Sequence, residues 1–385
     1  MNSHNKELRI CRLAIPRQTE EWLKVPHSVY AGDPYFIPQL NLLEKQRIDP
    51  NKAPFFTFGE AAFFVAYRDA APVGRVTAQV NRRHLEFHHD DTGHFGFFDC
   101  TNDSEAAHAL LEAARKWLKE KGLSRMMGPF SFSINEECGC LVAGFHSPPA
   151  MLMPHGAPWM GQFLEDNGLT KVIDLYAYRT KPEQLPPKIA QLAGRAARFG
   201  NVALRHFDMR RYRAEIDLLV DIYNDAWSDS WGFVPFSSAE IDSLAHELKP
   251  FFRNEYGRFL MLDGKEVGFA VGLPDLNGII ARFRGRLLPF NWLRLIWAMK
   301  RETWRTGRIP FLGVRREWRT TPRGSALVVL LVKDLVEQAS SHYHMDWAEY
   351  SWVRETDSRM VSLGEAIAGP PAKTYRIYAR SIECS

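Results

Sequence analysis

The chain has 385 residues, a formal net charge of +4, 45% hydrophobic residues and 24% charged residues. These values exclude an intrinsically disordered chain, a collagen and a pure coiled coil. The small net charge also argues against a protein that binds nucleic acid along a broad surface. At roughly 150 residues per domain, the length predicts two or three domains. The 11 Trp, 25 Phe and 12 Tyr residues suit a protein that handles an apolar substrate.

The beginning of the chain, Met1–Pro16, has no continuous apolar segment of the kind found in a signal peptide. No other stretch reaches the roughly 18 apolar residues of a membrane span. The cysteines are odd in number and lack the spacing of a disulfide framework, which favours reduced thiols in a cytoplasm. They are Cys11, Cys100, Cys138, Cys140 and Cys384.

Two parts of the chain follow the same order of elements: a hairpin, a helix, a strand and a Tyr-rich last strand. Asp263-Gly264 between two apolar runs is a strong hairpin signal. This order predicts a tandem duplication of one α/β unit. In the first half we expect Ala61–Tyr67, Val73–Val80, Ser104–Lys121 (with Ser104 as N-cap), Arg125–Ile134 and Leu175–Arg179; in the second, Arg258–Leu262, Glu266–Gly272, Ser325–Ser341, Met345–Val353 and Tyr375–Arg380.

Proline pairs after residue 180 mark a linker between the halves, and a short helix over Lys188–Phe199 bridges them. The second half then opens with a strand, Val202–Asp208, and a helix, Tyr212–Ala226. A capping box, Ser237-x-x-Glu240, starts a further helix. The expected domains are therefore residues 1–180 and 202–385, joined by a linker helix within residues 181–201.

A basic loop follows the predicted strand that ends at Val314, and a helix begins at Gly324-Ser325. The N–H groups and the dipole of a helix start favour a bound anion. Three arginines of the loop add charge where a diphosphate would lie. They are Arg316, Arg319 and Arg323. The alternative is an ordinary strand–loop–helix connection with a solvated basic turn.

The segment Val314-x-x-x-Trp318-Arg319-x-x-x-x-Gly324-Ser-Ala-Leu327 resembles motif A of the GNAT (Gcn5-related) acyltransferases. The resemblance implies that the strand at Val314 holds the pantetheine of acyl-CoA and that the loop cradles the CoA diphosphate. Arg319 matches the leading Arg of the motif and Gly324 its last Gly. Pro322 replaces the middle Gly, and Thr320-Thr321 replace a Gly-Arg pair. The implied cofactor-binding residues are Val314, Arg316, Arg319, Arg323, Gly324 and Ser325.

The first half resembles the same fold, but its corresponding loop, Phe97–Glu105, contains three acids and no arginine. Those acids would repel a diphosphate. We therefore expect a first domain with a degenerate CoA loop and an acyl-CoA site in the second. The expected fold class is α/β, with two tandem GNAT-like domains, each a mixed, mostly antiparallel sheet flanked by helices.

Segments in both halves resemble a tandem-GNAT group that includes bacterial ceramide synthases. The resemblance implies transfer of a fatty acyl chain from acyl-CoA to the amine of a long-chain sphingoid base. The alternatives are a GNAT acetyltransferase of a small soluble amine and a non-catalytic protein that binds a lipid or acyl-CoA. The segments are Gly74-Arg75-Val76, Gly93–Phe98, Gly128–Gly139, Leu141–Pro149, Met153–His155, Asp174–Tyr178, Tyr223–Trp227 and Trp231–Pro235.

Acylation of an amine needs a base for the ammonium proton, a donor for the oxyanion and an acid for the departing thiolate. Glu349 lies on the strand after the central helix, where GNAT enzymes often place an acid. Tyr375 or Tyr378 would protonate the thiolate, unless these tyrosines serve only in aromatic packing.

Three residues of the first half are further candidates for catalysis. Glu137 lies among Gly and Cys residues and is expected to be partly buried; the alternative is a carboxylate satisfied by nearby backbone N–H groups. His155 titrates in a useful range, or else caps a loop. Asp99, at the end of a Phe-rich strand, would face a substrate amine.

A cluster of histidines and aspartates occupies residues 84–94: His84, His88, His89, Asp90, Asp91 and His94. Adjacent His-His-Asp-Asp residues lack a spacing that directs several ligands to one metal ion. We therefore expect a polar turn between strands and no metal site.

Residues 282–308 interrupt the second domain with a stretch rich in Arg, Leu and Trp. A helix over Phe290–Trp304 would be apolar around most of its circumference and basic at its ends. Such a helix suits an anionic membrane surface, so we expect contact through residues 287–304 at the inner face of a membrane. The alternatives are a packing helix between domains, a dimer contact, or a wall of an acyl-chain tunnel.

Overall fold

A computed structural model describes residues 7–181, 185–301, 304–319, 321–342 and 345–383. Thr320 and Cys384, which entered the sequence interpretation, lie outside these ranges. The chain divides into two compact units. Unit 1 consists of Met1–Leu175, Ile279–Leu293 and Lys373–Ser385, and unit 2 of Tyr176–Gly278 and Arg294–Ala372.

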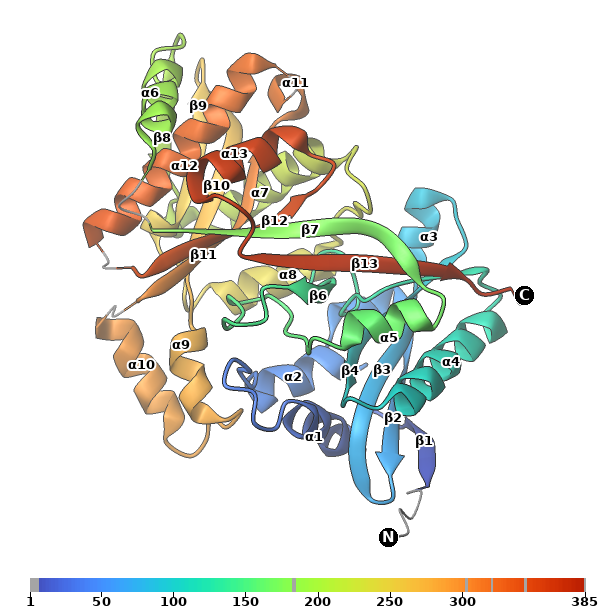
Figure 1. Cartoon of the computed structure of the whole chain (residues 1–385). Coiled ribbons are helices and arrows are strands. Elements are labelled where there is room, and N and C mark those ends of the chain that lie inside the picture. The colour runs from blue at the N-terminus through green and yellow to red at the C-terminus, as the bar shows by residue number, and fades with distance from the viewer. Residues whose placement is uncertain (1–6, 182–184, 302–303, 320, 343–344, 384–385) are drawn as a thin grey trace. The chain divides into compact units, whose positions relative to one another are not determined.

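Unit 1 contains a sheet with helices packed on it (Figure 1). Its elements are β1 (Leu8–Leu13), α1 (Thr19–Val29), α2 (Asn41–Ile48), β2 (Gly59–Arg68), β3 (Ala71–Asn81), α3 (Arg82–His88), β4 (Thr92–Cys100), α4 (Ser104–Glu120), β5 (Arg125–Gly128), β6 (Cys140–Ala143), α5 (Met160–Asp166), the first part of β7 (Thr170–Thr180), and β13 (Lys373–Ser381).

Unit 2 repeats the order of hairpin, helix and strand found in unit 1. Its elements are the rest of β7, α6 (Pro187–Ala196), β8 (Val202–His206), α7 (Tyr212–Trp227), α8 (Ser238–Leu248), β9 (Gly257–Leu262), β10 (Lys265–Pro274), β11 (Thr306–Val314), α11 (Arg316–Arg319), α12 (Pro322–His342), β12 (Trp347–Arg354) and α13 (Ser358–Ala368). Two helices cross the boundary between the units: α9 (Asn277–Ile280) and α10 (Asn291–Arg301).

The strand order is the same in both units. Unit 1 has β1-β2-β3-β4-β5-β13, with β6 also paired to β13, and unit 2 has β8-β9-β10-β11-β12-β7. The β4–β5 and β11–β12 pairs are parallel, and the hairpins β2–β3 and β9–β10 are antiparallel. The mixed, mostly antiparallel sheets and the duplicated plan of the sequence interpretation are therefore confirmed.

The last strand of each repeat lies in the other unit. β13 ends the second repeat in sequence but pairs with β5 and β6 of unit 1, and Tyr176–Thr180 of β7 belong to unit 2. The compact units thus differ from the expected ranges, 1–180 and 202–385, in these strands and in Ile279–Leu293.

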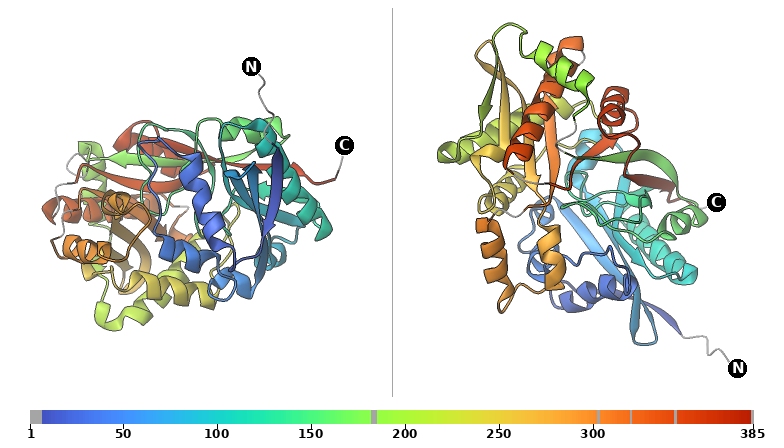
Figure 2. Two further views of the ribbon diagram at one scale, coloured as in Figure 1. Left: turned by 90° about the horizontal axis from the view of Figure 1, so that it is seen from below. Right: turned by 60° about the vertical axis from the view of Figure 1, so that its left-hand side comes forward.

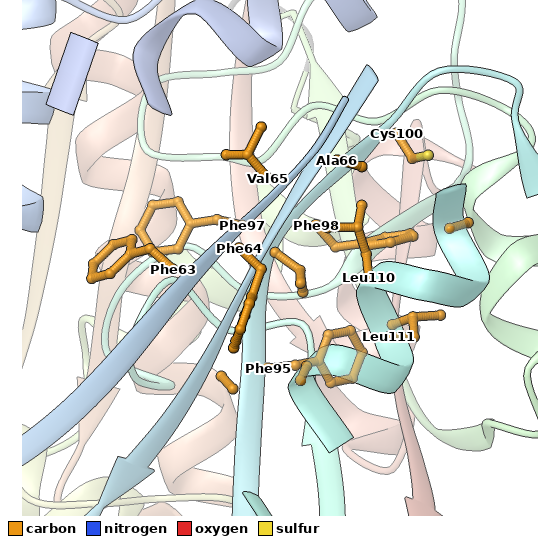
Figure 3. Close-up of a cluster of buried hydrophobic side chains, with 14 of the residues drawn as sticks. Phe63, Phe64, Val65, Ala66, Phe95, Phe97, Phe98, Cys100, Leu110 and Leu111 are labelled. Atoms are coloured by element: carbon orange, nitrogen blue, oxygen red, sulfur yellow. The ribbon is translucent and has the colours of Figure 1, made fainter. Parts of the chain in front are cut away.

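The core of unit 1 is aromatic on both faces of the sheet. Phe98 and Cys100 of β4 lie beside Leu110 and Leu111 of α4, whereas Phe63 and Phe97 lie on the opposite side of the strands (Figure 3). On that side Trp22 of α1 packs edge-on against Phe63, with ring centroids 5.1 Å apart. Helix α4 runs along β2 and β3 in both Figure 1 and Figure 2. Side chains that alternate along a strand supply both layers.

The core of unit 2 is aliphatic and forms under α12. Leu327, Leu331 and Leu335 of α12 pack against Leu260 and the other apolar residues of β9 and β10. The apolar positions of this helix recur at helical spacing, which is why the sequence predicted it. Helix α7 packs on β10 and β11.

Several local expectations can be compared with the structure. Asp263 and Gly264 have φ values of 51° and 79°, as a tight hairpin turn with two left-handed residues requires. The capping box at Ser237 and Glu240 is present. The N-cap of α4 is Asp103 rather than Ser104, since the Asp103 carboxylate accepts a hydrogen bond from Ala106 N–H. Strand β5 ends at Gly128 because Pro129 cannot donate to the ladder.

The histidine cluster does not form a simple turn. His84 and His88 lie on α3, and His94 lies on β4. The ring centroid of His84 lies 4.4 Å from that of His88 and 4.5 Å from that of His94. Burial lowers the pKa of His84 to about 4, so its ring is neutral at pH 7. Among the described residues, no group of three or more His, Cys, Asp or Glu side chains is arranged to hold a metal ion.

Candidate functional site

Strands β11 and β12 part within unit 2. They pair in parallel from Thr306–Trp347 to Ile309–Tyr350, while β11 continues to Val314 and β12 to Arg354. A cavity of about 520 Å³ lies between the parted segments. Its lining includes Pro310, Leu312 and Val314 of β11 and Ser351–Arg354 of β12. The strands therefore present backbone groups along a mainly apolar slot.

Three guanidinium groups line the same cavity: those of Arg319, Arg354 and Arg359. Arg359 donates to the backbone carbonyl of Arg319 over 2.8 Å, which holds the two residues together. Burial lowers the pKa of Arg354, and the neighbouring charge of Arg319 lowers it further, against the opposing effect of Asp357. The Nε of Arg354 is buried without a hydrogen-bond partner among the described residues. Crowded cations favour an anionic ligand.

The start of α12 explains why a glycine occupies position 324. A Cβ there would lie 2.0 Å from the Trp318 carbonyl oxygen, so only glycine permits this approach. The Thr321 hydroxyl accepts a hydrogen bond from Gly324 N–H over 3.0 Å. Thr321, which departs from the usual motif, thus caps one of the free donors at the helix start.

The predicted cofactor residues separate into two groups. Val314, Arg319 and Ser325 line the cavity. The other three are not among its lining residues: Arg316 forms an ion pair with Asp229 over 2.8 Å, Arg323 donates to the Phe199 carbonyl over 3.2 Å, and Gly324 packs under Trp318.

Glu349 lies on β12, as expected, but it is fully buried and is not a lining residue of the cavity. Its carboxylate accepts from Arg179 Nε over 2.8 Å and from the Ser351 hydroxyl over 2.9 Å. Ser351 also accepts from Arg308 Nε over 3.1 Å and does line the cavity. Glu349 therefore reaches the cavity only through Ser351.

A second, polar cavity of about 120 Å³ lies in unit 1, and Asp99, Glu137 and His155 all line it. These candidates come from β4 and from two loops that the sequence alone did not join. The cavity also receives Tyr30 from the end of α1 and Arg47 from α2.

Asp99 is fully engaged within this cavity. One carboxylate oxygen accepts from the Tyr30 hydroxyl over 2.5 Å, and the other accepts from Arg75 Nε over 2.7 Å. Burial and the Asp99 charge raise the pKa of Tyr30, so the phenol stays protonated and donates. Asp99 therefore positions Tyr30 and Arg75, and each of its carboxylate oxygens already accepts one hydrogen bond.

Glu137 and His155 also have partners. Glu137 lies 3.3 Å from Arg47, which also meets Glu136 over 3.2 Å and Glu44 over 3.4 Å. His155 Nε2 lies 2.8 Å from Asp33 Oδ2. Burial lowers the pKa of His155 and outweighs the opposing effect of Asp33.

Tyr375 and Tyr378 are fully buried on β13 in unit 1 and are not lining residues of either cavity. Tyr378 donates to Glu165 over 3.1 Å, and burial raises its pKa. Tyr375 packs over Gly139, where a Cβ would lie 2.8 Å from its own Cβ. The structure thus places the tyrosines and Glu349 in different units.

Sequence reasoning missed Tyr30, Asp33, Arg354 and Arg359, and assigned no role to Arg75. Only Arg75 carried a usable signal: an arginine inside the apolar run Val73–Val80 must find a buried partner. The others lie at the ends of helices or strands or in loops, where spacing gives no information about three-dimensional neighbours.

The fold resembles that of solved tandem acetyltransferases. One is a tandem GNAT protein from the clavulanic acid biosynthesis pathway, with a TM-score of 0.58, 13% identity, and coverage of 98% of this chain and 100% of that one. Another is a GCN5-related N-acetyltransferase from Sphaerobacter thermophilus, with a TM-score of 0.52, 14% identity, and coverage of 98% and 96%. At this identity the likeness concerns the fold alone.

No family model matches the chain. It is, however, 35% identical over 384 residues to the bacterial ceramide synthase of Caulobacter vibrioides, covering 99% of both chains. The chain is a tandem GNAT N-acyltransferase, of the group that includes the bacterial ceramide synthases. It is also 35% identical to the Escherichia coli protein YghO over 94% of this chain and 92% of that protein. Within the described part of this tandem GNAT enzyme, no helix is both long and apolar enough to cross a bilayer.

Proposed function

We propose that this enzyme transfers a fatty acyl chain from acyl-CoA to the amine of a long-chain sphingoid base. The observation that carries the proposal is the cavity of about 520 Å³ between β11 and β12, with apolar walls and arginines among its lining residues. The likeness to the ceramide synthase of Caulobacter vibrioides supports the choice of substrates.

The residues of unit 2 fit acyl-CoA in two respects. The pantetheine amides would lie along the β11 backbone near Val314, and the phosphates would meet Arg319, Arg354 and Arg359. Thr321 leaves fewer helix-start donors for the diphosphate than the usual motif does, so side-chain cations carry more of the binding. No metal is needed for this chemistry.

The acyl chain has an apolar continuation. Ile309 lines the large cavity and also a smaller one of about 60 Å³ between β10, β11 and α12. Leu273, Leu335 and Ala339 help to line the smaller cavity. A chain that passes Ile309 would leave water for an apolar pocket, which favours a long acyl donor over acetyl.

Helix α10 and the turn before it would bring the enzyme to its lipid substrate. Their large apolar side chains are exposed, and the guanidinium of Arg301 lies 4.5 Å from the ring centroid of Trp297. Exposed aromatic and basic residues together suit the surface of an anionic membrane. The exposed set is Leu288, Phe290, Trp292, Leu293, Ile296 and Trp297.

The proposal is tested by incubating the purified enzyme with palmitoyl-CoA or acetyl-CoA and a panel of amines, while following free thiol. We expect thiol release with palmitoyl-CoA and a long-chain base, and an N-acyl product by mass spectrometry. Release only with acetyl-CoA and a small soluble amine would replace the proposed function with a small-molecule acetyltransferase. Binding of palmitoyl-CoA without turnover of any amine would indicate a binding protein instead.

A further inference from the structure

The polar cavity of unit 1 contains a histidine, His155, whose second ring nitrogen has no hydrogen-bond partner in the described part of the chain. His155 Nε2 lies 2.8 Å from Asp33 Oδ2, and the His155 side chain is only 7% exposed. Its Nδ1 is buried and has no hydrogen-bond partner among the residues that the structure describes. The ring is held edge-on against Tyr30, with centroids 4.9 Å apart, and tilted against Phe36 at 5.8 Å.

The aspartate determines the tautomer of this histidine. A carboxylate only accepts, so the hydrogen bond to Asp33 requires a proton on Nε2. In the neutral ring Nδ1 then keeps its lone pair. Because burial lowers the pKa of His155, the neutral form predominates at pH 7. The dyad therefore offers a proton acceptor on a residue that lines the cavity.

The surrounding charges favour a cation. Arg75 forms an ion pair with one carboxylate, that of Asp99. The single guanidinium of Arg47 faces three, those of Glu44, Glu136 and Glu137. The carboxylate of Asp33 adds a further negative charge behind the histidine. The other charged groups that act on His155 are Lys373 and Asp99, and Lys373 donates to the carbonyl oxygens of Gly144 and Ser147. Acids thus outnumber bases around the cavity.

The backbone at this cavity is strained. Phe97, which lines it, has a φ of 47°, a conformation that is unfavourable for a bulky residue. The register of β3 against β4 shifts between Arg75 and Thr77, next to this residue. The Phe97 ring lies under Arg47, with 5.0 Å between the guanidinium and the centroid. Strain of this kind collects at ligand sites.

We propose that the cavity of unit 1 binds the head of a primary alkylammonium acceptor and that His155 Nδ1 takes a proton from it. The N–H bond of the ammonium breaks, its electron pair stays on the amine nitrogen, and a new N–H bond forms at Nδ1. Asp33 stabilises the imidazolium, which later releases the proton to water. A volume of about 120 Å³ corresponds to about four waters at their share of liquid volume, which is enough for an amine with neighbouring hydroxyls. That this amine is the acyl acceptor rests on the proposed function.

The test measures amine binding without any acyl donor, by calorimetry on the full chain with 2-amino-1,3-propanediol as the probe. His155→Gln and Asp33→Asn should each weaken binding at least tenfold. The matched control is His108→Gln, since His108 is an exposed histidine of the same unit whose Nδ1 lies 2.7 Å from Asn167 Oδ1. Equal affinity of the wild type and of both cavity variants would overturn the proposal.

A second measurement uses the wild type, so it does not depend on whether the variants fold. In nitrogen-15 spectra of the wild type, the probe should shift the His155 Nδ1 resonance and leave that of His108 in place. Turnover should fall about 10²- to 10⁴-fold in His155→Gln. In the wild type, the turnover rate should fall on the acid side with a midpoint below pH 6.5, because protonation of His155 removes the base.

Failure of this inference differs from failure of the proposed function. If thiol release from acyl-CoA proceeds but does not respond to His155, the base is elsewhere and the inference is wrong. If the probe binds and depends on His155 while no acyl-CoA is turned over, the inference stands and the proposed donor is wrong.

Discussion

Arg319 and Arg323 lie four residues apart, yet only Arg319 lines the cavity between β11 and β12. Arg319 also donates to the Ala226 carbonyl, which fixes its position. Arg323 turns toward Phe199 and Trp318, with its guanidinium 5.8 Å and 5.5 Å from their ring centroids. The sequence treats the two arginines alike, and the structure separates them.

We therefore predict that Arg319→Ala weakens CoA binding by about 10- to 100-fold, since hydrogen bonds to charged groups contribute about 1.5–3 kcal/mol. Arg323→Ala should change the affinity less than about threefold. Calorimetry with CoA measures both. Equal losses in the two variants would mean that the diphosphate lies over Arg323 instead.

The candidate residues show what a sequence can and cannot predict. Val314 and Arg319 line one cavity, and the sequence could bring them together because their motif is local: spacing alone places them at one strand end and in the loop that follows. Glu137 and His155 were proposed separately, but their shared cavity depends on α1 and α2, whose packing no spacing reveals. Asp33 is an ordinary loop acid in the sequence, and only the fold brings it to His155.

At the scale of elements, the hairpins, α4, α12 and the capping box followed from local patterns. Boundaries were less well predicted where tertiary contacts decide them. Asp103 rather than Ser104 caps α4, because its carboxylate is also held by Arg68 over 2.8 Å. The His84–His94 region folds into a helix and a buried strand, in which the rings of His88 and His94 both pack on that of His84.

Helix α10 exposes two tryptophan side chains: Trp292 is 40% exposed and Trp297 is 56% exposed. We predict that the double variant Trp292→Ala/Trp297→Ala binds vesicles of anionic lipid at least tenfold more weakly in a sedimentation assay. Phe87→Ala serves as the control, because Phe87 of α3 is similarly exposed. Wild-type binding that is insensitive to salt and equal on neutral vesicles would contradict the role of the basic residues.

At the scale of the whole molecule, β13 ends the second repeat in the sequence but belongs to the sheet of unit 1. Tyr378 of β13 is fully buried in the core of unit 1, and Arg376 meets Asp174 over 2.7 Å in the same unit. Although these residues follow unit 2 in the sequence, the stability of unit 1 depends on them.

We predict that Tyr378→Ala destabilises unit 1 by about 3–5 kcal/mol, as for other large buried rings. Melting in the presence of CoA should then show two transitions, with the CoA-protected one unchanged. Tyr378→Phe keeps the ring and loses only the hydrogen bond to Glu165, so its cost should be about 1 kcal/mol. If the Tyr378→Phe variant folds normally but no longer turns over acyl-CoA, the tyrosine is the acid that protonates the thiolate.

The position of β13 also affects how the protein is made. On the ribosome the residues of unit 1 up to Leu175 emerge first, but their sheet cannot be completed until Lys373–Ser381 have been translated. At synthesis rates of about 5–20 residues per second, that interval is roughly 10–40 s. During it β5 presents an open edge, which is a template for pairing with other chains. The nascent chain is therefore exposed to pairing with other chains until β13 has been made, so we expect faster translation of unit 2 to raise the yield of folded enzyme.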